Sequence, residues 1–127
     1  MKRALSLLVL IAAASSAQAN SIQTIFKPSS VLPTELQSEL YTYLLTHCSE
    51  YVIPYGLKET DTSVMAKDFD NGTVYYGYTT TLTSVYYFDG FHPDTADIVA
   101  KTSRSVKMDG SSRISIGQVL VNGSECQ

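Results

Sequence analysis

The sequence predicts an α+β domain in which one helix packs on a curved antiparallel meander of four to five strands. Apolar residues recur at helical spacing between residues 33 and 48. After residue 49 the pattern changes to alternation, in segments rich in Val, Thr and Tyr. Asp-Gly and Asn-Gly pairs separate these segments and indicate short turns between neighbouring strands.

Residues 1–19 are typical of a cleavable secretory signal peptide. Lys2 and Arg3 precede an apolar run over residues 4–14, and Ala17-Gln18-Ala19 forms a small-residue cleavage site. The run is shorter than the roughly 20 residues that span a membrane, although an uncleaved anchor helix is an alternative. Cleavage leaves residues 20–127, 108 of the 127 residues, as a single domain with no membrane span. We expect this domain to be periplasmic or secreted.

The charge distribution argues against a nucleic-acid partner. Without Lys2 and Arg3, seven basic residues face twelve acidic ones, which gives a formal charge of −5. The basic residues are scattered, and only Lys101, Arg104 and Lys107 lie close together. Proteins that bind nucleic acids present a clustered basic face instead.

The two cysteines, Cys48 and Cys126, predict a disulfide bond, because exported proteins meet an oxidising compartment. The bond would tie the end of the predicted helix to the C-terminus. The alternative is a catalytic or metal-binding thiol with His47 as its partner. Adjacent residues on a helix point about 100° apart, so this pairing is unfavourable and the disulfide is the preferred interpretation.

The helix is predicted from Pro33 to Cys48, after a lead-in segment over residues 20–32 that offers at most a short edge strand. Pro33 suits the first turn, and Thr34 and Gln37 have the spacing of a capping box. The predicted apolar stripe consists of Leu36, Leu40, Tyr43, Leu44, His47 and Cys48.

Strand segments follow the helix. Residues 51–55 alternate but contain Pro54, which restricts them to an edge or a loop. Residues 64–69 alternate next, and Asn71-Gly72 then predicts a hairpin with a type I′ turn. The strand over residues 73–88 is long, so a bend near Gly77 or Ser84 is expected.

Two further strands are predicted at about residues 96–108 and 112–121. In the last one the apolar phase slips at Gly117, which predicts a β-bulge. This layout resembles cystatin-like and nuclear-transport-factor-like folds, in which a curved sheet wraps a helix. The resemblance implies an arrangement of elements and no particular activity.

The segment Asp89-Gly90-Phe91-His92-Pro93 is similar to the Asp-x-x-His block of GDSL-type esterases. The Gly-Asp-Ser-Leu nucleophile block of that family is absent from the chain. The side chains of Asp89, His92 and Asp94 could also ligate a metal. Because Asp, Gly and Pro commonly build turns, we interpret the segment as a polar turn and predict neither a metal nor a cofactor.

Nine tyrosines are many for this length, and they suit either cross-strand packing or a binding surface. If Tyr76 and Tyr78 face the helix, alternation turns the neighbouring odd positions outward. The candidate binding surface is therefore Tyr75, Thr79, Thr81 and Thr83.

The leading functional hypothesis is a non-enzymatic module that binds an unknown protein or small ligand through this face or through a cleft between sheet and helix. One alternative is a small hydrolase or isomerase with acid–base residues among His92, Asp89 and His47. Another is a structural component of the cell envelope. The sequons at Asn71 and Asn122 are interpreted as turns.

Overall fold

The structure is a computed structural model, and it describes residues 24–52, 56–69, 71–87 and 89–126. Helix α2 (Thr34–His47) is followed by a short 3₁₀ turn, η1 (Ser49–Tyr51), and by the strands β1 (Leu57–Asp68), β2 (Val74–Tyr87), β3 (Pro93–Val106), β4 (Ser112–Val121) and β5 (Ser124–Glu125). The signal peptide predicted at residues 1–19 and the predicted effect of Pro54 lie outside the described residues.

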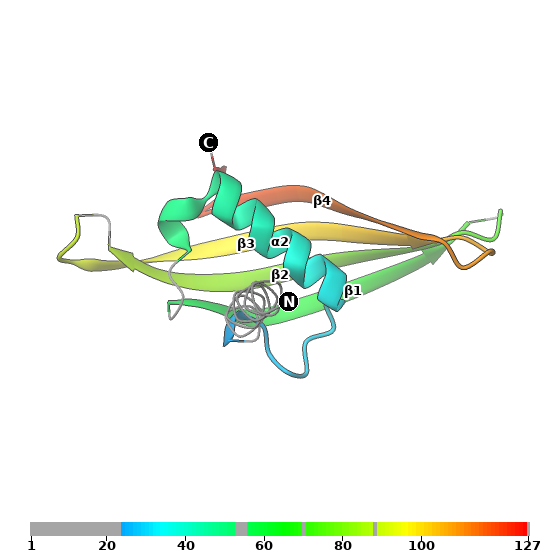
Figure 1. Ribbon diagram of the computed structural model, residues 1–127, viewed down its shortest axis with the longest axis horizontal. Helices are drawn as coiled ribbons and strands as arrows, with labels where there is room; N and C mark the ends of the chain where they lie inside the picture. Colours follow the sequence, from blue (N-terminus) through cyan, green and yellow to red (C-terminus); the bar gives the residue numbers. More distant parts are fainter. Residues whose placement is uncertain (1–23, 53–55, 70, 88, 127) are drawn as a thin grey trace, which may run out of the picture.

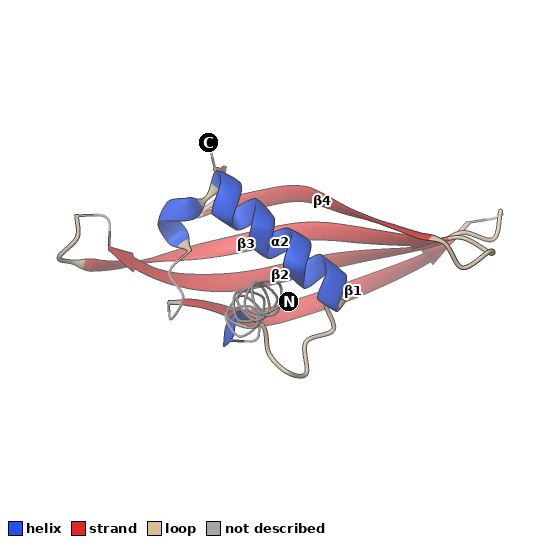
Figure 2. Ribbon diagram, viewed as in Figure 1, coloured by secondary structure: helices blue, strands red, loops and turns tan. Residues whose placement is uncertain are grey.

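The five strands form one antiparallel sheet in the order β1-β2-β3-β4-β5, with α2 across one face (Figures 1 and 2). The predicted α+β class and the packing of a helix on a meander are therefore confirmed for the described residues. Tyr51, which the sequence placed in an alternating segment, lies in η1 instead. Residues 26–32 form no strand, and Ile25, Phe26 and Leu32 are buried in the core.

Helix α2 packs through four residues at four-residue spacing, and all of them are buried: Leu36, Leu40, Leu44 and the C-cap Cys48. His47 is exposed, contrary to the predicted stripe, because it lies beside the buried four-residue row and not on it. Its ring lies against Tyr43, with 4.4 Å between ring centroids. The predicted capping box is also absent. Gln37 Nε2 donates instead to the Leu32 carbonyl, at 2.8 Å.

Alternation divides the sheet into a helix side and an outward side. Residues that pair directly across antiparallel strands share a face, so the register fixes which side chains lie together. Even-numbered residues of β2 and β3 lie on the helix side. The buried members there are Tyr78, Thr80, Leu82, Ser84, Ala96, Ile98, Ala100 and Thr102, joined by Val119 and Val121 from β4.

The β-bulge predicted at Gly117 is confirmed. Ala100 pairs with Val119, whereas Thr102 pairs with Ile116, so Lys101 faces two residues of β4. A side chain at Gly117 would bring its Cβ to 3.0 Å from the Lys101 carbonyl oxygen, which is why glycine fits there. A bend was expected in β2 near Gly77 or Ser84. The pairing of β2 with β3 is not interrupted at either position.

The hairpin at Asn71-Gly72 forms, but its turn differs from the predicted type I′ turn. The Phe69 N–H donates to the Thr73 carbonyl at 2.9 Å, and the Gly72 N–H donates to the Phe69 carbonyl at 3.0 Å. These bonds close a three-residue loop that ends in Gly72, whose φ is +80°. A two-residue Asn-Gly turn occurs instead between β4 and β5, where Asn122 and Gly123 have φ values of 51° and 87°.

The predicted disulfide is confirmed and joins the end of α2 to the residue that follows β5. The Cα atoms of Cys48 and Cys126 are 5.4 Å apart, and the two residues are separated by 78 positions. Both sulfurs are consumed by the bond, so the alternative of a free thiol paired with His47 is wrong.

Hydrogen bonds to Glu59 link the segment before α2 to the edge strand β1. The Glu59 side chain is 5% exposed. It accepts hydrogen bonds from the Lys27 backbone N–H at 2.9 Å, from Ser30 Oγ at 2.7 Å and from Thr62 Oγ1. Burial raises the pKa of Glu59, but these bonds outweigh it, so the pKa lies below its ordinary value.

Replacing Glu59 with Gln is expected to lower the free energy of unfolding by about 1.5–3 kcal/mol at pH 7, the range for hydrogen bonds to a charged group. A pKa lowered by folding stabilises the protein above the pKa of the unfolded state, and that contribution disappears as the pH falls through the folded pKa. The difference between wild type and Glu59→Gln should therefore shrink below about pH 4.

Urea denaturation at pH 7 and at pH 3.5 measures this difference. Glu39→Gln is the matched control, because Glu39 is exposed on α2, and it should change stability by no more than about 0.5 kcal/mol. A difference for Glu59→Gln that stays constant with pH would contradict the expectation.

Candidate functional site

The outward face of the sheet carries the predicted binding residues. Tyr75, Thr79, Thr81 and Thr83 occupy odd positions of β2, opposite to the buried even positions, and all four are partly exposed. The structure thus brings these four side chains onto one face, in line along one strand. Each pairs with an outward-facing residue of β3, namely Ser105, Lys101, Val99 and Asp97.

A hollow of about 310 Å³ lies on this face around Gly77. Tyr75 and Thr79 line it from β2, together with Met65 of β1 and Lys101 of β3. The hollow exists because Gly77 has no side chain: a Cβ at this position would lie 3.4 Å from the Tyr75 ring and 4.0 Å from the Met65 methyl group. Thr81 and Thr83 extend the face beyond the hollow.

Sequence reasoning missed Gly77, Met65 and Lys101 as members of this site. The available signal was Gly77 itself, since a glycine inside a strand often marks a place where another group approaches closely. Met65 and Lys101 are exposed, and pairing places Met65 opposite Gly77 and Lys101 opposite Thr79. Only the register of three strands reveals that these residues are neighbours.

The charge around the hollow is positive, although the protein as a whole is acidic. The strand register places four outward-facing residues in one row across the sheet, next to the hollow: Lys67, Tyr75, Ser105 and Arg113. Of the cations Lys67, Lys101 and Arg113, only Lys101 lines the hollow, and Lys67 Nζ lies 5.6 Å from the centroid of the Phe69 ring. The site therefore combines an aromatic ring, hydroxyl groups and positive charge.

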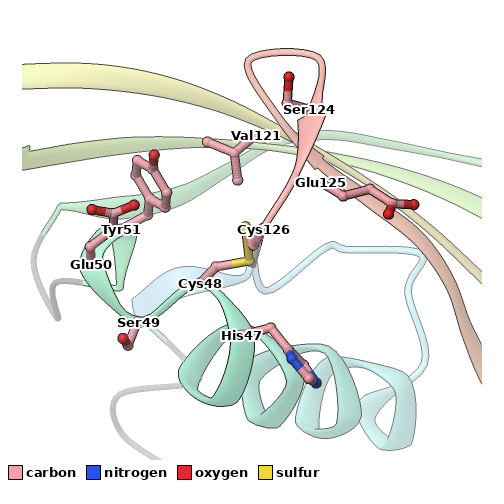
Figure 3. A pocket seen from close by; sticks show the side chains of 9 residues that line it. All are labelled: His47, Cys48, Ser49, Glu50, Tyr51, Val121, Ser124, Glu125 and Cys126. Carbon is pink, nitrogen blue, oxygen red and sulfur yellow. A yellow bond between two sulfur atoms is a disulfide. The ribbon is translucent and has the colours of Figure 1, made fainter.

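A second hollow, of about 430 Å³, lies where the end of α2 meets the C-terminal strand (Figure 3). The Cys48–Cys126 bond lies in its wall, between Glu50 and Tyr51 on one side and Glu125 on the other. Burial, reinforced by the hydrogen bond and charge of Glu50, raises the pKa of Tyr51.

The polar side chains of this second hollow do not form a catalytic arrangement. Figure 3 shows His47 and Glu125 directed away from the disulfide, on the opposite side from Glu50 and Tyr51. These groups surround the bond and do not converge on one point. The hollow lies between the end of α2 with η1 and the C-terminal residues of the described chain.

The polar turn after β2 is built by local hydrogen bonds. Asp89 Oδ1 accepts from the backbone N–H groups of Phe91 and His92, at 2.9 and 2.7 Å, and Asp89 Oδ2 lies 2.6 Å from His92 Nδ1. The backbone bond from His92, then its side chain and the Phe91 N–H, lower the pKa of Asp89. The His92 side chain is 78% exposed, on a hairpin that lines neither hollow.

Asp94 does not join this pair, because its Oδ1 accepts from the Thr95 N–H at 2.8 Å. Within the residues that the structure describes, no group of three or more His, Cys, Asp or Glu side chains is arranged to hold a metal ion. Asp89, His92 and Asp94 thus remain weak candidates: local turn geometry accounts for the bonds of Asp89, and Asp94 interacts with Tyr86, its partner across β2 and β3.

Fold and site together describe a small α+β protein with one disulfide and a hollowed, hydroxyl-rich sheet face. Comparisons with protein-family models, curated proteins and solved structures found no match for this chain. Across the described part of the chain, no helix has both the length and the apolar character needed to cross a membrane.

Proposed function

We propose that this protein is an exported binding module that holds a protein or a small ligand on the outward face of its sheet, at the hollow around Gly77. The observation that carries the proposal is the hollow itself, lined by Tyr75, Thr79 and Lys101. Tyrosine offers apolar contact and a polar tip in one side chain, and it is enriched at binding surfaces.

Export is proposed from the leader-like residues 1–19 and from the disulfide, since such bonds persist in oxidising compartments. The layout that we propose is cystatin-like or nuclear-transport-factor-like, with the sheet curving around α2. A binding role suits a domain of this size, in which a rigid sheet presents the side chains and no large conformational change is required.

The two alternative roles lack a supporting observation. A hydrolase or isomerase would need acid–base groups that converge on a hollow. Asp89 and His92 lie on an exposed hairpin, and His47, which lines the second hollow, is directed away from Glu50 and Tyr51 (Figure 3). An assembly role through a free strand edge would need an unpaired tyrosine-rich strand, and β2 is paired on both sides, with β1 and with β3. The outward face is therefore the place where we expect a ligand.

Filling the hollow should abolish binding without loss of stability. In Gly77→Val the branched side chain would occupy the floor of the hollow, and valine suits a strand better than glycine does. In Thr79→Glu a carboxylate would face the ligand directly. We expect both variants to recover at least about tenfold less partner than the wild type, which corresponds to about 1.4 kcal/mol of binding free energy.

The measurement is a quantitative pull-down from the extract of the compartment to which the protein is exported, with thermal denaturation of each variant as a check on folding. Ser38→Glu is the matched control, because Ser38 is exposed on α2, on the other side of the sheet. Equal recovery by the wild type, Gly77→Val and Thr79→Glu would refute the outward face as the binding surface.

A further inference from the structure

The helix covers only half of the sheet face on which it lies. A helix of 14 residues is about 21 Å long, whereas a strand of 14 residues, such as β2 or β3, is about 46 Å long. Figure 1 shows the strands continuing past the Thr34 end of α2 toward the hairpins at residues 69–73 and 107–111. The buried residues of β2 and β3 end at Tyr78 and Thr102, and the residues between these positions and the hairpins are partly exposed.

We call the uncovered part on the helix side the open half; it is formed by the helix-side residues of β1, β2, β3 and β4 from Val64, Tyr78, Thr102 and Ile116 toward these hairpins. The register places two rows of side chains across its inner part. The boundary row is Val64, Tyr78, Thr102 and Ile116, and the next row is Ala66, Tyr76, Arg104 and Ile114. Apart from Thr102 and Arg104, these side chains are aliphatic or aromatic, and Val64 is well exposed to solvent.

Two polar atoms in these rows are buried and have no hydrogen-bond partner among the described residues. They are Thr102 Oγ1 and Arg104 Nε, which belong to neighbouring positions on the same side of β3. Thr102 is only 4% exposed. No carboxylate of the described residues forms an ion pair with Arg104. A buried donor without an acceptor is costly, so the open half combines apolar contact with a positively charged side chain whose Nε lacks an acceptor among the described residues.

We propose that the open half binds an amphipathic helix of a partner protein that carries one carboxylate within its apolar stripe. The same sheet face already packs a helix, since α2 buries a stripe of leucines against it. A second helix placed past the Thr34 end of α2 would cover Tyr76, Ile114 and Ile116. Its carboxylate would receive the Arg104 guanidinium, in the geometry that arginine favours.

Other occupants match this chemistry less well. Residues 1–23, which precede the described chain, contain neither Asp nor Glu and therefore cannot supply the acceptor from a side chain. A second copy carries the same negative net charge, which opposes self-association. The open half also lies on the opposite side of the sheet from the hollow around Gly77, so this inference is independent of the proposed function.

A peptide titration tests the inference on the protein from residue 20 to residue 127. The probes are two fluorescein-labelled amphipathic 18-residue peptides that are identical except for one Glu or one Gln in the leucine stripe. We expect the Glu peptide to bind the wild type at least tenfold more tightly than the Gln peptide, by fluorescence anisotropy. In Arg104→Gln the preference should fall below twofold, whereas Arg113→Gln, on the outward face, should retain it.

A second variant keeps the test valid if Arg104→Gln folds poorly. Ile114 lies directly opposite Arg104, so Ile114→Glu supplies an internal carboxylate and should also remove the preference for the Glu peptide. Gly77→Val, on the outward face, should leave the preference for the Glu peptide intact. Equal binding of the two peptides, no binding of either, or the same loss in Arg113→Gln would overturn the inference. A wild-type dimer in sedimentation that Arg104→Gln converts to a monomer would also overturn it, because it would assign the face to a second copy.

Discussion

Removing the disulfide by replacing Cys48 and Cys126 together with alanine is expected to lower the free energy of unfolding by up to about 4.5 kcal/mol. The bond closes a loop between residues 78 positions apart. The chain-entropy relation for a loop of this length gives about 4.5 kcal/mol at 25 °C. Alanine keeps the buried position of Cys48 apolar, so the loss reports mainly on the cross-link.

Urea denaturation of the wild type, the double variant and the wild type kept in reductant measures this loss. The reduced wild type serves as the control, because it retains both sulfur atoms and lacks only the bond between them. A double variant within about 1 kcal/mol of the oxidised wild type would show that the cross-link contributes little. Mass spectrometry of the native protein tests export at the same time: an intact Met1, or a mass with both thiols reduced, would contradict it.

Leu40→Ala is expected to cost about 2–5 kcal/mol, the range for truncating a fully buried leucine. Leu40 is 0% exposed at the centre of the α2 stripe, and it packs where the helix crosses the sheet. Truncation would leave a cavity between helix and sheet. Because a domain of this size is stabilised by only about 5–15 kcal/mol, the variant should melt well below the wild type.

Leu45→Ala provides the matched comparison on the same helix. Leu45 is 43% exposed, so its truncation should change stability by no more than about 1 kcal/mol. Thermal and urea denaturation of the two variants measure the contrast. Equal losses in Leu40→Ala and Leu45→Ala would mean that the packing of α2 on the sheet does not determine stability.

Much of the fold follows from local patterns. The leucines of α2 repeat at helical spacing, and the phase slip at Gly117 predicts the bulge, because each pattern reflects contact with a single core. The turn at Asn71-Gly72 could not be assigned in the same way. Its type depends on whether Phe69 and Thr73 pair, which is decided by the register of the whole hairpin and not by the Asn-Gly pair.

The candidate site was predictable only in part. Alternation alone separates Tyr75 and Thr79 from the buried Tyr78, so the outward face could be identified from the sequence. The hollow could not, because it requires Met65 and Lys101 to lie beside Gly77, and both come from other strands. Likewise, the sequence does not reveal that Arg104 Nε lacks a hydrogen-bond acceptor, because its neighbours Tyr76 and Ile114 come from other strands.

The position of the cross-link has a consequence for proteolysis. Every strand of the sheet lies between Cys48 and Cys126. A protease that cuts the chain once at an exposed hairpin, such as residues 107–111, would therefore open a ring without releasing a fragment. Both pieces would remain tethered at the end of α2 and could pair again, so a nicked molecule would separate only after reduction. In a compartment that contains proteases, this connectivity lets the protein survive a single cleavage.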